Sequence, residues 1–282
     1  MPDPFEHCEA LVRAHDKDRF LAALFAPARH RRALHALYAF DVETARIRER
    51  AREPMPGELR LQWWRDAIGG VVGEAIGHPV VAALREVIVR YGLSPAALVA
   101  LIDARSFDLY DEPMASLGQF QAYANQTAAI VFQAAVRILC GGTGDGLPQL
   151  AEDAGQAAAI AEVLAALPRH AARRQLYVPL DLLAQYGAGA EDVFAGRATV
   201  ELRAALAAMR LRARRHLARL AASGARVPQP AIAAFLPLAP VAPWLRRMER
   251  RSYDPFRPPQ LPQWRRQWRI WRVAHSLARL AP

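Results

Sequence analysis

Apolar side chains recur at the spacing of an α-helix along most of this chain. Residues 79–91, 95–110, 116–140 and 149–167 each place apolar side chains at i, i+3 and i+4, which aligns them on one face of a helix. Within residues 58–75, Trp63, Trp64, Ala67 and Ile68 form a similar stripe. No series of segments alternates apolar and polar residues as half-buried strands do. The pattern therefore predicts an all-α fold.

Proline and capping residues give the expected helix boundaries. A helix over 5–25 should end at Pro27, one over 29–52 should end before Pro54, and Ser94-Pro95 supplies an N-cap and a first turn. Further helices are expected over 179–186 and 200–223. The glycine-rich segment 141–146 lacks the spacing and the Lys-Ser/Thr pair of a phosphate-binding loop, so it is interpreted as a linker.

Composition limits the class of partner and the compartment. The 282 residues carry a formal charge of +10, and Lys17 is the only lysine, so arginine supplies the positive charge and favours anionic partners. Cys8 and Cys140 form no disulfide framework or metal spacing, which fits a reducing cytoplasm. No signal peptide and no uninterrupted apolar run of about 18 residues is evident. We expect a cytoplasmic protein, free or peripheral on the inner face of a membrane.

Several motifs occur in the order and spacing of one enzyme family. They are His15-Asp16-Lys17-Asp18-Arg19-Phe20, Phe25-Ala26-Pro27, residues 31–40 ending Tyr38-Ala39-Phe40, residues 103–109 with Tyr123, and residues 155–179 ending Tyr177-Val178-Pro179. Through them, residues 10–250 resemble the squalene/phytoene synthases. The resemblance implies an isoprenoid-synthase-type helical bundle around a central cavity. It divides the chain into a synthase-like domain over 1–250 and a Trp/Arg-rich helical extension over 251–282.

The acidic metal site of the family is degraded. Where the resemblance implies three aspartates in the first motif, this chain has Ala45, Arg46 and Glu49. Where it implies an asparagine and two aspartates in the second, the chain has Glu162, Ala166 and His170. One carboxylate remains on each helix, and neither helix keeps a pair that could share Mg²⁺. We therefore assign no metal ligand and no catalytic residue.

The resemblance also places side chains around the cavity. The candidates for contact with a prenyl or lipid ligand are His15, Phe20, Tyr38, Phe132 and Tyr177. Asp16 and Asp18 replace serines that would favour a phosphate, and an unpaired carboxylate there would repel one. Phe132 stands where the family usually has a glycine, which would shrink the chamber.

One branch of the family shares this pattern of losses: the squalene/phytoene synthase-like assembly factors of respiratory complex I, known from mitochondria. The similarity lies in Phe40-Asp41-Val42-Glu43, in Leu61-Gln62-Trp63-Trp64-Arg65, and in Pro168 with Arg173 and Arg174 before Tyr177. It implies a non-catalytic protein whose partners are complex I subunits or assembly proteins. The alternative is an active head-to-head prenyltransferase that forms squalene, hydroxysqualene or phytoene with Mg²⁺. A nucleic-acid-binding protein is the weakest hypothesis, because no recognised module is present.

The C-terminal extension has a tryptophan stripe. Trp264, Trp268 and Trp271 fall at i, i+4 and i+7, with Arg265 and Arg269 beside them. Such a helix could bind an anionic membrane surface or a partner protein. Since apolar stripes usually face a core, we favour packing of the tryptophans on the bundle.

Overall fold

The computed structural model describes residues 3–51, 53–70, 77–143, 145–257 and 261–280, and every regular element within these ranges is helical. The predicted all-α fold is confirmed. No helix among the described residues is both long enough and apolar enough to cross a membrane.

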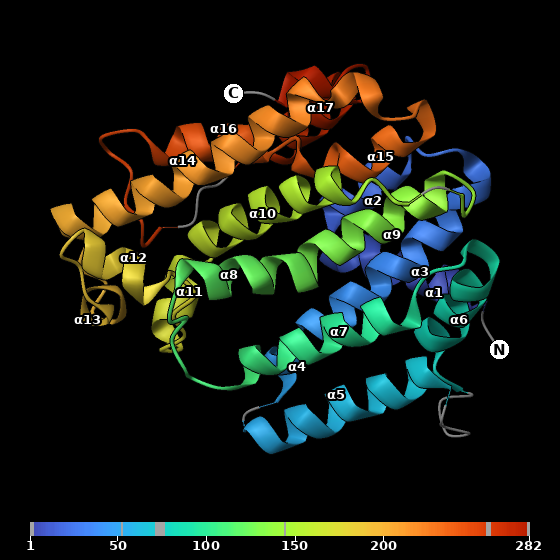
Figure 1. The fold of residues 1–282 in the computed structure, drawn as a ribbon, viewed down its shortest axis with the longest axis horizontal. Coiled ribbons are helices and arrows are strands. Elements are labelled where there is room, and N and C mark those ends of the chain that lie inside the picture. The colour runs from blue at the N-terminus through green and yellow to red at the C-terminus, as the bar shows by residue number, and fades with distance from the viewer. Residues whose placement is uncertain (1–2, 52, 71–76, 144, 258–260, 281–282) are drawn as a thin grey trace.

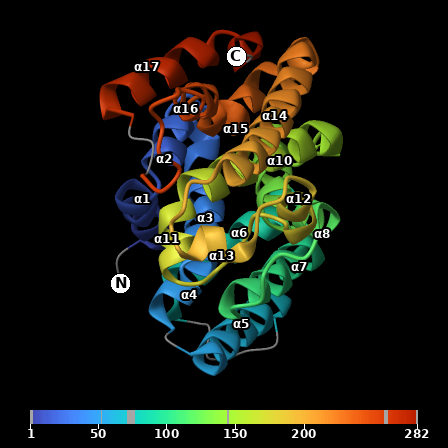
Figure 2. The same ribbon diagram turned by 90° about the vertical axis from the view of Figure 1, so that its left-hand side faces the viewer.

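The N-terminal half supplies one side of the bundle (Figures 1 and 2). Helix α3 (Ala28–Ala45) packs against α1 (Pro4–His15), α6 (Pro79–Tyr91) and α9 (Ile130–Leu139). Helix α5 (Pro54–Gly69) lies along α7 (Pro95–Arg105) at the lower edge in Figure 1. The run from Leu34 to Phe40 explains the central place of α3, because every residue of this mostly apolar segment is buried.

Helix α10 (Pro148–Ala165) connects the two halves. It packs on α9, on a π-helical turn, η3 (Asn125–Ala129), and on α14 (Val200–Ala222). Gly155 permits this approach, because a Cβ atom there would lie 2.5 Å from the backbone nitrogen of Ala129. Six shorter helices lie around these: α8 (Leu117–Ala124), α11 (Leu167–Ala172), α12 (Leu180–Gln185), α13 (Ala190–Phe194), α15 (Ile232–Phe235) and α16 (Val241–Met248).

Several predicted helices are divided, and local chemistry explains the breaks. The helix expected over 5–25 ends at His15, because Asp16 leaves helical geometry and its side chain caps α2 (Lys17–Ala23) by accepting from Arg19 N at 2.9 Å. The helix expected over 29–52 breaks at Arg46, and α4 (Ile47–Arg50) follows.

Three other expected helices also differ from the structure. The helix expected over 116–140 is interrupted by η3, and the one expected over 95–110 finishes in a 3₁₀ turn, η2 (Ser106–Leu109). Helix α5 begins at Pro54, before the expected residue 58, and ends at Gly69, followed by Gly70 at a positive φ of 82°. Residues 71–75, where we expected that helix to continue, lie outside the described ranges.

The C-terminal segment packs onto the bundle. Helix α17 (Gln263–Ala274) contacts α2 and a 3₁₀ turn, η6 (Leu236–Leu238), while the last turn, η7 (Leu277–Leu280), packs on α14. Ile270, Val273, Leu277 and Leu280 are the buried side chains of this contact. An ion pair from Arg266 to Asp18 joins α17 to α2. Residues 261–280 therefore share a core with the helices of the synthase-like part.

Candidate functional site

The two motif regions meet at helix ends. Ala45 is the last residue of α3, Arg46 follows it, and Glu49 lies on α4. Glu162 lies near the end of α10, Ala166 just after it, and His170 on α11. Both motifs thus lie where a long helix breaks into a short one, and the ion pair of Glu49 with Arg169 brings the two breaks together.

Two arginines form ion pairs with Glu49, the carboxylate that remains in the first motif. Arg46 Nε donates to a Glu49 carboxylate oxygen at 3.3 Å, and Arg169 Nη1 donates to the other at 3.5 Å. Since Arg169 lies on α11, this second contact connects the two motif regions directly. Two positive groups therefore surround the acid that a divalent ion would need, and they oppose the approach of a cation.

The second motif keeps Glu162 and His170 in different surroundings. Solvent reaches Glu162, although its carboxylate lies close enough to Arg105, Asp41 and Arg19 to interact with their charges. His170 packs against the Tyr177 ring, with 4.6 Å between ring centroids. Burial, with Arg169 and Arg173 nearby, lowers the pKa of His170 to about 4. The imidazole is therefore neutral at physiological pH and has no positive charge with which to bind a diphosphate.

A set of polar side chains fills the space between the motif helices and the middle helices. We call Arg19, Asp41, Arg105, Asp108, Tyr123 and Tyr177 the central polar network. Asp41 accepts from Arg19 at 2.5 Å and from Arg105 at 3.2 Å. Asp108 accepts from Arg105 at 3.4 Å, and its Oδ1 accepts from the hydroxyls of Tyr123 and Tyr177, each at 2.7 Å. The network joins α2, α3, α7, η2, α8 and the segment after α11.

The charges within this network balance each other. Its two arginines face two aspartates, and Asp41 is 5% exposed. Burial alone would raise the pKa of Asp41, but Arg19 and Arg105 outweigh it and hold that pKa below its ordinary value. Burial and the adjacent Asp108 raise the pKa values of Tyr123 and Tyr177, so both phenols stay protonated as donors. The guanidinium groups that could bind a diphosphate are thus already paired with carboxylates of the same chain.

The structure brings only two of the five predicted cavity residues to this network. Tyr177 belongs to it, and the Arg19 guanidinium lies 5.3 Å from the Tyr38 ring centroid. Phe20 instead stacks on His35 at 5.8 Å, Phe132 stacks on Phe235 at 6.1 Å, and His15 is exposed at the end of α1.

The residues of the network that sequence reasoning missed are Arg19, Asp41, Arg105, Asp108 and Tyr123. One signal could have found Asp41, because a carboxylate inside the apolar run of α3 must be buried and therefore needs positive partners. The pairing itself joins residues up to 64 positions apart and depends on how α2, α3 and α7 pack. Within the described ranges, no group of three or more His, Cys, Asp or Glu side chains is placed to hold a metal ion.

The C-terminal tryptophans face outward, so the favoured expectation that they pack on the bundle is wrong. Trp264, Trp268 and Trp271 are 62%, 49% and 52% exposed. The helix instead buries Ile270 and Val273, which occupy its opposite face. The i, i+4, i+7 spacing does place the tryptophans on one stripe, but the arginine-rich helix uses two smaller aliphatic residues for its core contact.

This chain is similar to known proteins over most of its length. Residues 12–272 match the family model for squalene/phytoene synthase. A Rattus norvegicus protein named NADH dehydrogenase (ubiquinone) complex I, assembly factor 6 is 30% identical over 258 residues, which cover 91% of this chain and 77% of that protein. A Thermus thermophilus phytoene synthase is 27% identical over 209 residues, covering 72% and 69% of the two chains.

Solved structures show the same fold. The squalene synthase HpnC from Alicyclobacillus acidocaldarius superposes with a TM-score of 0.76 at 24% identity, covering 90% of this chain and 95% of that one. A dehydrosqualene synthase in complex with a ligand superposes with a TM-score of 0.80 at 16% identity, covering 96% and 95%. The expected isoprenoid-synthase-type bundle is thereby confirmed.

Proposed function

The chain belongs to the squalene/phytoene synthase family, and we propose that it is a non-catalytic member that assists the assembly of respiratory complex I (NADH dehydrogenase). Its partners would be subunits or assembly proteins of that complex. We place it in the cytoplasm, peripheral to the inner face of the membrane in which the complex is built.

The proposal that the protein is non-catalytic rests on the ion pairs that Glu49 forms with two arginines. This acid of the first motif is paired with Arg46, which replaces an acidic residue, and with Arg169 from the opposing motif. Departure of a diphosphate from an allylic substrate needs Mg²⁺ held by several oxygen ligands. The residues present here do not fit that ion, because arginine and alanine stand among the required oxygen donors.

The central polar network supports the same conclusion. Arg19 and Arg105 would be the natural donors to a phosphate at the centre of the bundle, and Asp41 binds both. A diphosphate would have to displace a buried carboxylate and leave that carboxylate without its partners, which costs several kcal/mol, on the order of 3–5.

The assembly role rests on similarity to the rat protein named complex I assembly factor 6. The alternative, an active prenyltransferase, rests on similarity to the phytoene synthase. The two functions differ in whether they require the carboxylates that remain in the motifs. An enzyme would depend on Glu49 and Glu162 for Mg²⁺, whereas an assembly factor would not.

A complementation experiment separates them. In a strain that lacks the gene, the proposal expects loss of assembled NADH dehydrogenase on native gels while polyprenoid levels stay normal. The double variant Glu49→Gln, Glu162→Gln should restore assembly as well as the wild type, because Gln keeps the size of both side chains and neither acid serves a metal.

Purified protein gives the second measurement. Incubated with farnesyl or geranylgeranyl diphosphate and Mg²⁺, it should release no pyrophosphate and form no coupled product. Release that the Glu49→Gln, Glu162→Gln variant abolishes would establish the prenyltransferase instead. Failure of that variant to restore assembly would also contradict the proposal.

A further inference from the structure

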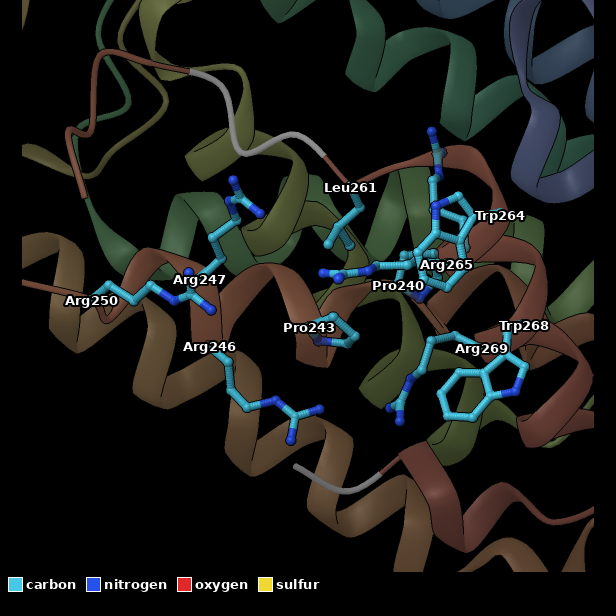
Figure 3. A pocket seen from close by; sticks show the side chains of 11 residues that line it. Pro240, Pro243, Arg246, Arg247, Arg250, Leu261, Trp264, Arg265, Trp268 and Arg269 are labelled. Carbon is cyan, nitrogen blue, oxygen red and sulfur yellow. The ribbon is translucent and has the colours of Figure 1, made fainter. Parts of the chain in front are cut away.

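The C-terminal helix forms one wall of a surface pocket. This pocket has a volume of about 500 Å³ and lies between α16 and α17 (Figure 3). Pro240 and Pro243 line it together with Arg246, Arg247 and Arg250 on one side, and Trp264, Arg265, Trp268 and Arg269 on the other. We call this pocket and the adjoining Trp271 and Arg272 the basic–aromatic groove.

Most arginines of the groove lack acidic partners; Arg266, which also lines the pocket, is paired with Asp18. Among the described residues, no carboxylate forms an ion pair with Arg246, Arg247, Arg250, Arg265 or Arg269. The nearby acids are already engaged: Glu249 binds Arg214 through two contacts of 2.7 Å, and Asp18 binds Arg266. The groove therefore concentrates positive charge, most of which the protein leaves uncompensated.

Burial and repulsion between neighbouring arginines both act on Arg269, which lines the groove. Burial, together with the positive charges of Arg246 and Arg272, lowers the pKa of Arg269 below the ordinary value of an arginine. The Arg269 Nε atom is also buried without a hydrogen-bond partner. An anion seated between α16 and α17 would relieve both conditions.

The tryptophans extend the groove with an apolar surface. All three of α17 are about half exposed or more, and they project from one helical stripe. Arg265 lies 5.1 Å from the Trp264 ring centroid, and Arg272 lies 4.7 Å from that of Trp268, so the cations are held against the rings. Tryptophan with arginine suits the boundary between lipid headgroups and acyl chains, where the indole has one apolar and one polar side.

The groove is fixed to the bundle. Ile270 and Val273 bury the opposite face of α17, and the Arg266–Asp18 ion pair connects the helix to α2. A membrane would therefore meet a preformed surface, with little ordering of the chain on binding.

We propose that the basic–aromatic groove binds the phosphate groups of anionic phospholipids and seats the protein on a membrane surface, with Trp264, Trp268 and Trp271 inserted among the headgroups. This inference deepens the proposed function by naming the surface and the lipid class, and it rests on that function only for the expectation of a membrane location. Arginines without acidic partners beside an outward tryptophan stripe suit the headgroup boundary of an anionic lipid surface. Stacking of the same rings on the bases of RNA is the competing outcome that the binding experiment includes.

Vesicle co-sedimentation tests the proposal with the 282-residue chain. The wild type should bind vesicles of phosphatidylcholine mixed with phosphatidylglycerol and should not bind phosphatidylcholine alone. Reversing two exposed arginines, in Arg246→Glu, Arg265→Glu, should weaken binding at least about 25-fold, since each basic residue near such a surface contributes about fivefold. Tryptophan emission should shift to shorter wavelength on binding, and Trp264→Ala, Trp268→Ala should reduce this shift.

The matched control is Arg60→Glu, Arg90→Glu, which changes the net charge equally with exposed residues of α5 and α6. Its affinity should stay within about twofold of the wild type. The proposal is overturned if both double variants lose affinity equally, or if the wild type binds no vesicles or binds those of phosphatidylcholine alone. Stronger binding to RNA or to inorganic phosphate than to the mixed vesicles would also overturn it. Because these assays use purified protein and lipid, their failure leaves the complementation result standing as a separate test of the assembly role.

Discussion

At the scale of single residues, Asp41 is the side chain on which the centre of the bundle depends. It is the common acceptor of Arg19 and Arg105, which come from different helices. Removing one partner from a buried ion-pair network leaves uncompensated charge, and that cost exceeds the net contribution of the intact pair. The carboxylate thus holds the centre together and occupies the arginines that a phosphate would use.

Replacing Asp41 with Asn should lower the free energy of unfolding by about 3–5 kcal/mol, because both arginines lose their charged partner in a buried site. Urea unfolding followed by circular dichroism measures the change. The control Glu191→Gln removes a carboxylate from the exposed pair with Arg174, whose side chains are 74% and 66% exposed, and should cost under about 1 kcal/mol. Equal effects of the two substitutions would contradict the central role of Asp41.

His170 should make stability depend on pH. Its pKa is about 4 in the folded protein against an ordinary 6.5, so the unfolded chain binds the proton more readily. Stability should therefore fall as pH decreases from about 6.5 to about 4, by at most about 3 kcal/mol from this group. His170→Gln should flatten that part of the curve of unfolding free energy against pH. An unchanged slope would show that the imidazole is protonated without cost in the fold.

At the scale of elements, the contact between α10 and η3 sets the spacing of the middle of the bundle. A Cβ at Gly155 would meet the Ala129 nitrogen at 2.5 Å and its Cα at 2.7 Å. Backbone atoms cannot move aside as a flexible side chain can. A glycine is therefore required where the two segments cross.

Gly155→Ala should destabilise the protein by about 1–3 kcal/mol, because the helices must separate to admit the methyl group. Gly77→Ala is the control, since no heavy atom lies within 4 Å of a Cβ built there, and it should change stability by less than about 0.5 kcal/mol. Thermal and urea unfolding of the two variants give the comparison. If Gly155→Ala leaves the free energy of unfolding unchanged, α10 and η3 lie farther apart than the structure has them.

At the scale of the whole molecule, residues 261–280 behave as part of the bundle. They contribute Ile270, Val273, Leu277 and Leu280 to the hydrophobic core. Burying side chains of this size contributes about 1.5–3 kcal/mol each. Their removal would also expose the surfaces of α14 and η6 on which they pack.

Ending the chain at residue 260 should therefore lower the unfolding midpoint by at least about 10 °C in a thermal scan. The full chain should unfold in one transition that circular dichroism and tryptophan fluorescence report at the same temperature. An unchanged midpoint after truncation would identify 261–282 as an independent appendage.

The sequence by itself determined the helical class, the family and the loss of the acidic motifs, because helical periodicity and motif spacing are local properties of the chain. Ala45, Arg46 and Ala166 cannot supply carboxylate oxygens in any fold. Only the tertiary structure decided where the remaining charges go. The pairing of Asp41 with Arg19 and Arg105, the contact of Glu49 with Arg169, and the outward direction of the C-terminal tryptophans all depend on helix packing between residues distant in the chain. A stripe of tryptophans indicates one face of a helix, and only the neighbouring helices decide whether that face is covered.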